Sequence, residues 1–284
     1  MNSLRNSIDL NMVRKILEKT KNILFVNPRI LCENERHLIN KSFHFKGTNG
    51  KAILLLHGWT AVPYEFRRLG VYLNEAGYTV YAPMLSGHGT IYTDLEKVKY
   101  EDWIIDSQKA YFKLKEENRE VFVGGTSMGS ILAMHLAKEN EDIKGLVLLA
   151  TPYRIKLERI GKLWMLFIGL FKKYQKKFYL PTLETQKTII REISYQTYPI
   201  KSVLELGKLI KLSRKNLEKI KQPCLIMQSS SDYVIARESL RKIYKKIGST
   251  HKKKKYIKKS YHTFISDIKN EHVFEEILEF IKSI

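Results

Sequence analysis

Cysteine is scarce in this sequence, and long apolar runs are missing. Cys32 and Cys224 are the only cysteines among 284 residues, and they form no CxxC or Cys/His cluster. We therefore expect neither a disulfide framework nor a structural zinc site, and we expect a reducing environment. The longest apolar run, at 163–171, is too short to cross a bilayer, and the N-terminus lacks a signal peptide's apolar stretch. The sequence predicts a cytoplasmic protein that contacts membranes only peripherally.

Acidic residues are few relative to basic ones. Lys and Arg number 50 against 29 Asp and Glu, which gives a formal net charge of +21. Such a charge first suggests nucleic acid as a partner. The lysines are spread along the chain, however, and no zinc finger, RNA-recognition signature or helix-turn-helix pattern accompanies them. We expect no nucleic-acid partner. We interpret the densest basic run, at 251–259, as a solvated face, with attraction to anionic lipid or substrate as the alternative.

Internal repeats and low-complexity tracts are absent, and 44% hydrophobic residues are enough for a sizeable core. Apolar strand-like runs alternate with helical patterns from residue 41 onward. Strands are expected at 41–47, 52–58, 79–83, 121–125, 145–152, 223–229 and 254–258. Helices are expected at 9–25, 63–77, 100–117, directly after Ser127, and at 270–284. This alternation predicts an α/β fold with a mostly parallel central sheet flanked by helices.

The alternation breaks at residues 154–219, which are basic and largely helical in pattern. We interpret this segment as a helical cap, or lid, inserted over the strand ends. Residues 1–50 are then an N-terminal extension with a helix and the first strand, and 51–153 with 220–284 form the core. The piece at 161–178 is apolar and then strongly basic. It is expected to pack on the core, and the alternative is a lip that lies on an anionic membrane.

A serine stands between two glycines at the end of a predicted strand. Gly125, Ser127 and Gly129 fit G-x-S-x-G within "GGTSMGS", between the strand-like "VFVG" and the helical "ILAMHLAKE". At such a turn the serine adopts a strained backbone angle, and side chains at the glycine positions would collide with the strand and the helix. The turn exposes the serine hydroxyl beside a helix N-terminus. We predict a nucleophile here, and an ordinary tight turn is the alternative.

A serine hydroxyl needs a base, and the base needs an orienting acid. The strand–turn–helix arrangement requires the chain order Ser, then Asp or Glu, then His. Asp232 follows the strand-like "CLIMQS" in a loop, whereas Asp142 lies at an exposed helix end. His262 follows the last predicted strand, whereas His251 opens the lysine run, where positive charge disfavours an imidazolium. We predict Asp232 as the acid and His262 as the base.

Acyl transfer also needs hydrogen-bond donors for the oxyanion. One is expected from the residue after the nucleophile, the backbone N–H of Met128. The other is expected from the loop "HGWT" after an earlier strand, where the Trp59 N–H is the candidate. His57 in that loop is an alternative base, but an HG pair there more often shapes the backbone.

These motifs together resemble the α/β-hydrolase family. The stretches "LLLHGWTAVPYEFRRLGVYLNEAGYTVYAPMLSGHG", "GGTSMGS", "SSSDYV" and "SYHTFISD" are most similar to its bacterial carboxylesterases that resemble monoacylglycerol lipase, over about residues 50–284. The resemblance implies the same nucleophile, acid, base and oxyanion donors, and a helical lid at 154–219. Met84 replaces a usual acidic residue, and Ser229 and Tyr261 replace common glycines.

The sequence therefore predicts a serine hydrolase that cleaves carboxylic esters through an acyl-enzyme, without a metal or organic cofactor. An aromatic-rich, basic cap suggests monoacylglycerol, lysophospholipid or medium-chain acyl esters, which makes a small-molecule or lipid ester the expected partner. Two other readings stay open. An aminopeptidase or thioesterase would use the same residues on another bond. A basic binding module for anionic membrane or nucleic acid would not be an enzyme at all.

Overall fold

The computed structural model describes residues 37–177, 194–267 and 270–284. The helix predicted for 9–25 lies outside the described residues. The centre of the molecule is a seven-stranded sheet in the order β1-β3-β2-β4-β5-β8-β9. Its strands are β1 (Phe43–Phe45), β2 (Lys51–Leu56), β3 (Thr79–Ala82), β4 (Glu120–Thr126), β5 (Leu146–Leu149), β8 (Cys224–Ser229) and β9 (Lys252–Ile257). All neighbouring pairs are parallel except β1 with β3. The predicted α/β fold is confirmed.

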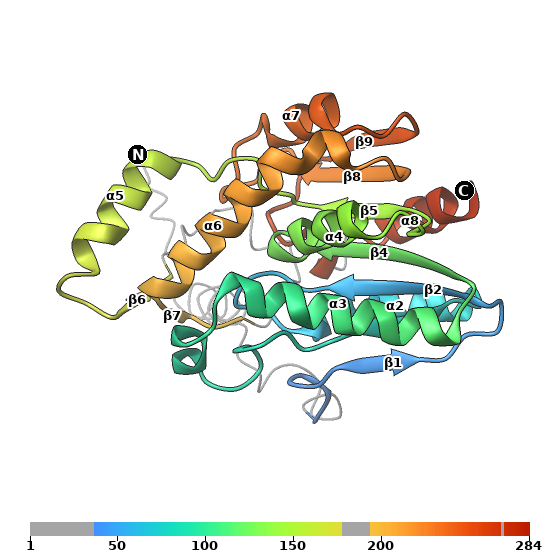
Figure 1. Cartoon of the computed structure of the whole chain (residues 1–284), viewed down its shortest axis with the longest axis horizontal. Coiled ribbons are helices and arrows are strands. Elements are labelled where there is room, and N and C mark those ends of the chain that lie inside the picture. The colour runs from blue at the N-terminus through green and yellow to red at the C-terminus, as the bar shows by residue number, and fades with distance from the viewer. Residues whose placement is uncertain (1–36, 178–193, 268–269) are drawn as a thin grey trace, which may run out of the picture.

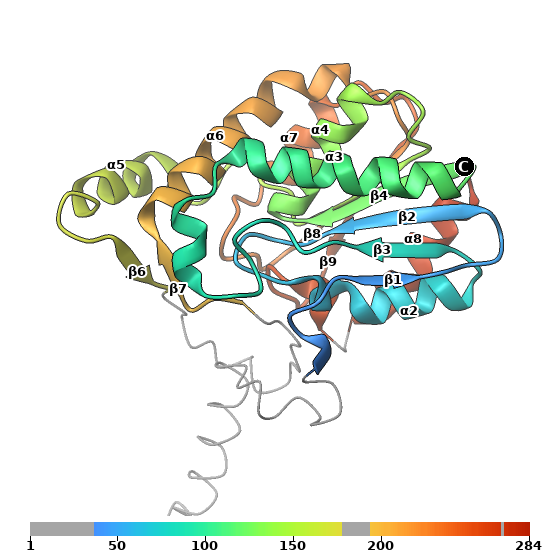
Figure 2. The same ribbon diagram turned by 60° about the horizontal axis from the view of Figure 1, so that its bottom comes forward.

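Helices cover both faces of this sheet (Figures 1 and 2). One face carries α3 (Tyr100–Glu117), α4 (Met128–Glu139), α6 (Ile200–Asn216) and α7 (Ser239–Lys246), and the other carries α2 (Arg67–Glu75) and α8 (His272–Lys282). Short 3₁₀ turns lie at η2 (Pro63–Phe66), η3 (Tyr92–Glu96), η5 (Leu217–Lys219) and η6 (Phe264–Ser266). The helix α7 was not predicted from the sequence.

The burial of the sheet on both faces explains the near-continuous apolar strands. In β2, Leu54 and Leu56 belong to the core beneath α3, α4, α6 and α7. Ile53 and Leu55 belong to the core beneath α2 and α8. Because successive side chains of a strand point to opposite faces, every position of β2 from Ala52 onward must be apolar.

Residues 154–219 add α5 (Glu158–Ile168), the strands β6 (Tyr174–Lys176) and β7 (Thr197–Pro199), and α6. The strands β6 and β7 form a small antiparallel sheet that the largely helical pattern did not predict. α6 packs along α4, while α5 projects at one end of the molecule, away from the central sheet (Figures 1 and 2). Within the described ranges, every helix is too short or too polar to span a membrane.

Candidate active site

Ser127 lies at a sharp turn between β4 and α4. Its φ is 52° and its ψ −111°, a backbone conformation that costs energy for a residue with a side chain. A Cβ on Gly125 would lie 2.3 Å from the carbonyl carbon of Gly129, and a Cβ on Gly129 would lie 1.8 Å from the oxygen of Leu56. Both distances are far inside van der Waals contact. The two glycines are therefore required for α4 to pack against the strands at this turn.

Asp232 and His262 form a hydrogen-bonded pair. The Nδ1 of His262 lies 2.8 Å from Oδ2 of Asp232, and the other carboxylate oxygen accepts the N–H groups of Val234 and Ile235 at 2.8 and 2.9 Å. Burial of Asp232 opposes ionisation, but the charge and hydrogen bond of His262 and these N–H groups outweigh it. The pKa of the carboxyl therefore lies below its usual value. The pair presents an ionised acid to an imidazole.

The loops that carry the pair are joined by Ser229, a position where the resemblance led us to expect glycine. Its hydroxyl donates to the carbonyl oxygen of Ser260 and accepts the N–H of Ser231 at 3.0 Å. Ser229 is the last residue of β8, just before the loop that carries Asp232, and Ser260 lies just before His262. The serine therefore connects the acid loop to the histidine loop, which a glycine could not do.

The two predicted oxyanion donors are backbone N–H groups of Trp59 and Met128. Within the described residues, neither N–H makes a hydrogen bond. Met128 is the first residue of α4, where backbone donors have no partner inside the helix. Trp59 lies in the loop that follows β2, and it lines a cavity together with Ser127.

That cavity has a volume of about 300 Å³, and three of the predicted site residues line it, whereas Asp232 and Met128 lie outside its lining. Ser127, His262 and Trp59 line it from the sheet edge. Tyr198, Leu206 and Ile210 line it from the segment 154–219. The carboxyl ends of parallel strands are where ligands bind in such folds. Nowhere in the described part of the chain do three or more His, Cys, Asp or Glu side chains gather as a metal site.

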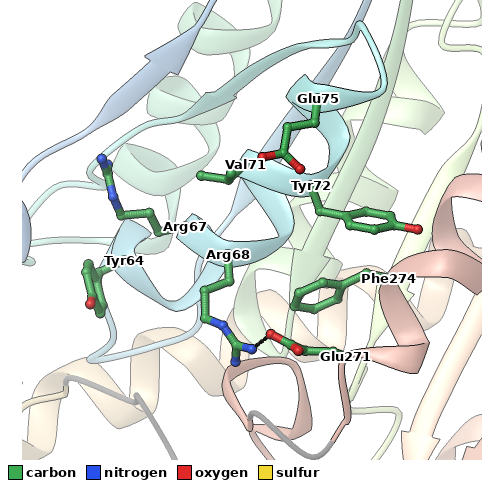
Figure 3. Close-up of a pocket in the computed structure, with 8 residues that line it drawn as sticks. All are labelled: Tyr64, Arg67, Arg68, Val71, Tyr72, Glu75, Glu271 and Phe274. Atoms are coloured by element: carbon green, nitrogen blue, oxygen red, sulfur yellow. Dashed lines mark ion pairs between the residues drawn. The ribbon is translucent and has the colours of Figure 1, made fainter.

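A larger hollow of about 390 Å³ is lined by residues of η2, α2 and α8 and by none of these residues (Figure 3). Two of its lining residues, Arg68 and Glu271, form an ion pair. Size alone would favour this hollow. We assign the candidate site to the smaller cavity, because only that cavity is lined by Ser127 and His262.

His57 does not line the cavity. It is fully buried, its Nδ1 lies 3.0 Å from the oxygen of Gly58, and its Nε2 accepts the N–H of Leu85 at 3.1 Å. Burial, with a contribution from His88, holds the pKa of His57 well below its usual value. The ring is neutral and shapes the backbone, as the preferred interpretation of the HG pair expected.

Sequence reasoning missed Glu65 and His88. The carboxylate of Glu65 lines the cavity and accepts the N–H of Gly58 at 2.7 Å. Nε2 of His88 accepts the N–H of Thr60 at 3.0 Å. The "GHG" stretch was a signal for His88, but Glu65 lies in a helical pattern where a glutamate is ordinarily exposed.

Comparisons with known proteins place the chain among hydrolases. The family described as serine aminopeptidase, S33, matches residues 47–269. A thermostable monoacylglycerol lipase of Bacillus sp. (strain H-257) is 32% identical over 237 residues, covering 83% of this chain and 92% of the relative. A carboxylesterase of Bacillus subtilis (strain 168) is 32% identical over 245 residues, covering 86% and 97%.

Solved structures show the same fold. A metagenome-derived lipolytic enzyme superposes with a TM-score of 0.79 at 26% identity, covering 87% of this chain and 98% of that one. The monoacylglycerol lipase of Paleococcus ferrophilus superposes with a TM-score of 0.71 at 18% identity, covering 85% and 98%.

Proposed function

Because the chain belongs to the serine aminopeptidase S33 family of α/β-hydrolases, we propose that it hydrolyses carboxylic esters through Ser127, His262 and Asp232. The observation that carries the proposal is the Asp232–His262 pair at 2.8 Å, whose histidine lines one cavity with the strained Ser127. The 32% identical relatives named monoacylglycerol lipase and carboxylesterase support ester hydrolysis.

The proposed reaction has two steps. The Ser127 oxygen attacks the ester carbonyl carbon while Nε2 of His262 takes the hydroxyl proton. His262 then passes that proton to the departing alcohol as the carbon–oxygen bond breaks, which leaves an acyl-serine. A water molecule attacks this acyl group, again giving its proton to His262, and the carboxylic acid departs as Ser127 is protonated. Asp232 stabilises the imidazolium in both steps.

The negative oxygen that forms in each step is held by the N–H groups of Trp59 and Met128. Both lack a hydrogen-bond partner in the described ranges, so they are available to a substrate. Donors fixed in place before the reaction need no reorganisation as the charge develops, and losing one typically costs about 3 kcal/mol of barrier.

The substrate class that we propose is a monoacylglycerol, a lysophospholipid or another medium-chain acyl ester. The cavity wall supports it, because Leu206 and Ile210 from α6 and Ile155 and Ile235 from neighbouring loops are apolar. Its volume of about 300 Å³ is at the small end for ligand pockets, which favours one acyl chain over several.

A fluorophosphonate probe and a substrate panel test this function. The probe should label the wild type and fail to label Ser127→Ala. Acyl esters from acetyl to long-chain, with matched thioesters and amides, should show the highest kcat/KM for medium-chain esters. A strict acetyl preference would refute the lipid substrate, and faster cleavage of amides or thioesters would instead support an aminopeptidase or thioesterase. Absent labelling of a folded wild type would favour a non-catalytic binding module.

We further propose that α5 rests on anionic membranes in a peripheral, reversible way, from a cytoplasmic location. Apolar side chains more than half exposed gather on and beside this helix: Leu157, Ile160, Leu163, Trp164, Phe167, Leu170 and Phe171. The exposed Lys172, Lys173 and Lys176 follow them directly. An apolar patch next to cationic side chains matches the acyl boundary and the headgroups of an anionic lipid surface.

Vesicle sedimentation tests the membrane contact. Wild type should bind phosphatidylglycerol vesicles more tightly than phosphatidylcholine vesicles, and the triple variant Leu163→Ser, Phe167→Ser, Phe171→Ser should lose this binding. The control is Ile105→Ser with Phe112→Ser, which removes exposed apolar side chains from α3 instead. Equal vesicle binding by both variants would overturn the proposal. So would a wild-type dimer that dissociates only in the triple variant, because the apolar side chains of α5 would then contact a second copy of the chain.

A further inference from the structure

Three consecutive backbone N–H groups, in the loop that follows β2, differ in their hydrogen-bond acceptors. The N–H of Gly58 donates to Oε1 of Glu65 at 2.7 Å, and the N–H of Thr60 donates to Nε2 of His88 at 3.0 Å. The N–H of Trp59, between them, makes no hydrogen bond within the described residues. The loop is thus held on both sides of the Trp59 N–H, the donor that it contributes to the proposed reaction.

We propose that Glu65 is a positioning residue that fixes the loop at Gly58 so that the Trp59 N–H meets the oxyanion. The inference rests on the proposed function, since it concerns the same oxyanion. Glu65 is only 4% exposed and belongs to the 3₁₀ turn η2, just after the loop. Burying a carboxyl group is costly unless it is hydrogen-bonded. A side chain kept there for packing alone would be better served by an apolar residue.

The other anchors show that this loop is held from several directions. Nδ1 of His88 lies 3.0 Å from the carbonyl oxygen of Ser86, which only a protonated Nδ1 can contact favourably. Burial lowers the pKa of His88 to about 4, so near neutral pH its Nε2 carries no proton and can accept the N–H of Thr60. His57 holds the carbonyl oxygen of Gly58 at 3.0 Å.

The loop needs anchors because its backbone is strained. Thr60 has a φ of 66°, in the left-handed region that a β-branched residue rarely occupies. Such strain persists only where the surroundings fix the backbone. Without the Glu65 acceptor, the His57–Gly58 peptide loses the anchor on its N–H, and Gly58 is held through its carbonyl oxygen, which contacts His57 and accepts the N–H of Ala61. A shift of the backbone at Gly58 tilts the adjoining Trp59 N–H out of alignment.

A donor that matters only when the oxyanion forms should affect kcat and leave KM nearly unchanged. Glu65→Leu removes the carboxylate acceptor and puts an apolar side chain of similar size in its place. We expect it to lower kcat on an ester such as p-nitrophenyl butyrate by roughly 10²-fold, the typical loss of an oxyanion donor. Inhibition by an alkyl boronic acid, which mimics the tetrahedral state, should weaken by a similar factor.

Two conservative variants separate positioning from charge and from folding. Glu65→Gln keeps a carbonyl oxygen at the same reach, so it should retain most of the wild-type kcat. Glu65→Asp keeps the charge but is shorter by one methylene, so it should lose kcat as Glu65→Leu does. These two variants decide the question even if Glu65→Leu does not fold.

Three outcomes would overturn the inference: full kcat in Glu65→Asp or Glu65→Leu, equal loss in Glu65→Gln, or a loss confined to KM. The proposed function is judged separately, by fluorophosphonate labelling of the wild type and of each variant. If the wild type is labelled and hydrolyses esters, but substitutions of Glu65 leave kcat unchanged, only the positioning role fails.

Discussion

Gly125 and Gly129 leave no space for a side chain, because the backbone of α4 lies directly against β2 and β4. The contact is closest at Gly129, whose added Cβ would overlap the backbone oxygen of Leu56. A backbone atom cannot rotate away as a flexible side chain can. A methyl group at this position must therefore move the helix or the strand, and either motion displaces Ser127.

Gly129→Ala should destabilise the fold by about 3 kcal/mol or more, since overpacking against a fixed backbone is costly. Activity should fall in the fraction that remains folded. Gly207→Ala is the matched control, because Gly207 lies in α6 with nothing within 4 Å of an added Cβ. It should stabilise the chain by roughly 0.5–1 kcal/mol through helix propensity. Urea unfolding measures both, and unchanged stability of Gly129→Ala would contradict the steric argument.

At the scale of elements, the segment 154–219 contributes two helices of different kinds. α6 shares the core with α3 and α4, and its Leu209 is fully buried. α5 leaves most of its apolar side chains in solvent, and its Leu163 is 69% exposed. α6 is thus a structural part of the hydrolase body and also lines the cavity. α5 adds little to that body.

The two leucines make this difference measurable within one segment. Leu209→Ala should lower the free energy of unfolding by about 2–5 kcal/mol, because it removes buried methyl groups and leaves a cavity. Leu163→Ala should change it by less than about 0.5 kcal/mol, as an exposed substitution usually does. Thermal unfolding of both variants checks the pair. Similar losses would show that α5 packs more closely than its exposure indicates.

Across the whole molecule, burial keeps several histidines neutral. Desolvation lowers the pKa values of His44, His57, His88 and His135 from their usual value. A free imidazole titrates at about pH 6.5. When the pH falls through this value, these histidines become protonated in the unfolded chain but stay unprotonated in the folded chain. The unfolded state is then favoured, and the fold loses stability as the medium becomes acidic.

We therefore expect the urea midpoint to fall steadily from pH 7 to pH 5, a range above the usual titration of carboxyl groups. His135→Gln should reduce the slope, because it removes one of these histidines from a partly exposed helix position without touching the site. Chemical denaturation at several pH values measures the slope. A midpoint independent of pH across this range would contradict the burial of neutral imidazoles.

Much of the candidate site could be proposed from the sequence because each of its members follows a strand. Ser127 directly follows β4, Asp232 and His262 lie in the loops that follow β8 and β9, and parallel strands end at one edge of a sheet. Glu65 offered no such signal, because its acceptor role arises only when η2 returns beneath the loop. β6 and β7 were missed because three-residue strands carry no periodicity.

The sequence by itself determined the α/β fold and the chain order of the proposed nucleophile, acid and base, because alternating apolar patterns and turn residues are local properties of the chain. The tertiary structure alone decided which groups meet. It placed Glu65 and His88 around the Trp59 loop, joined Ser229 to Ser260, and set Leu206 and Ile210 in the wall of the cavity that Ser127 also lines. These contacts join residues far apart in the chain or buried by distant elements, so only the folded packing fixes them.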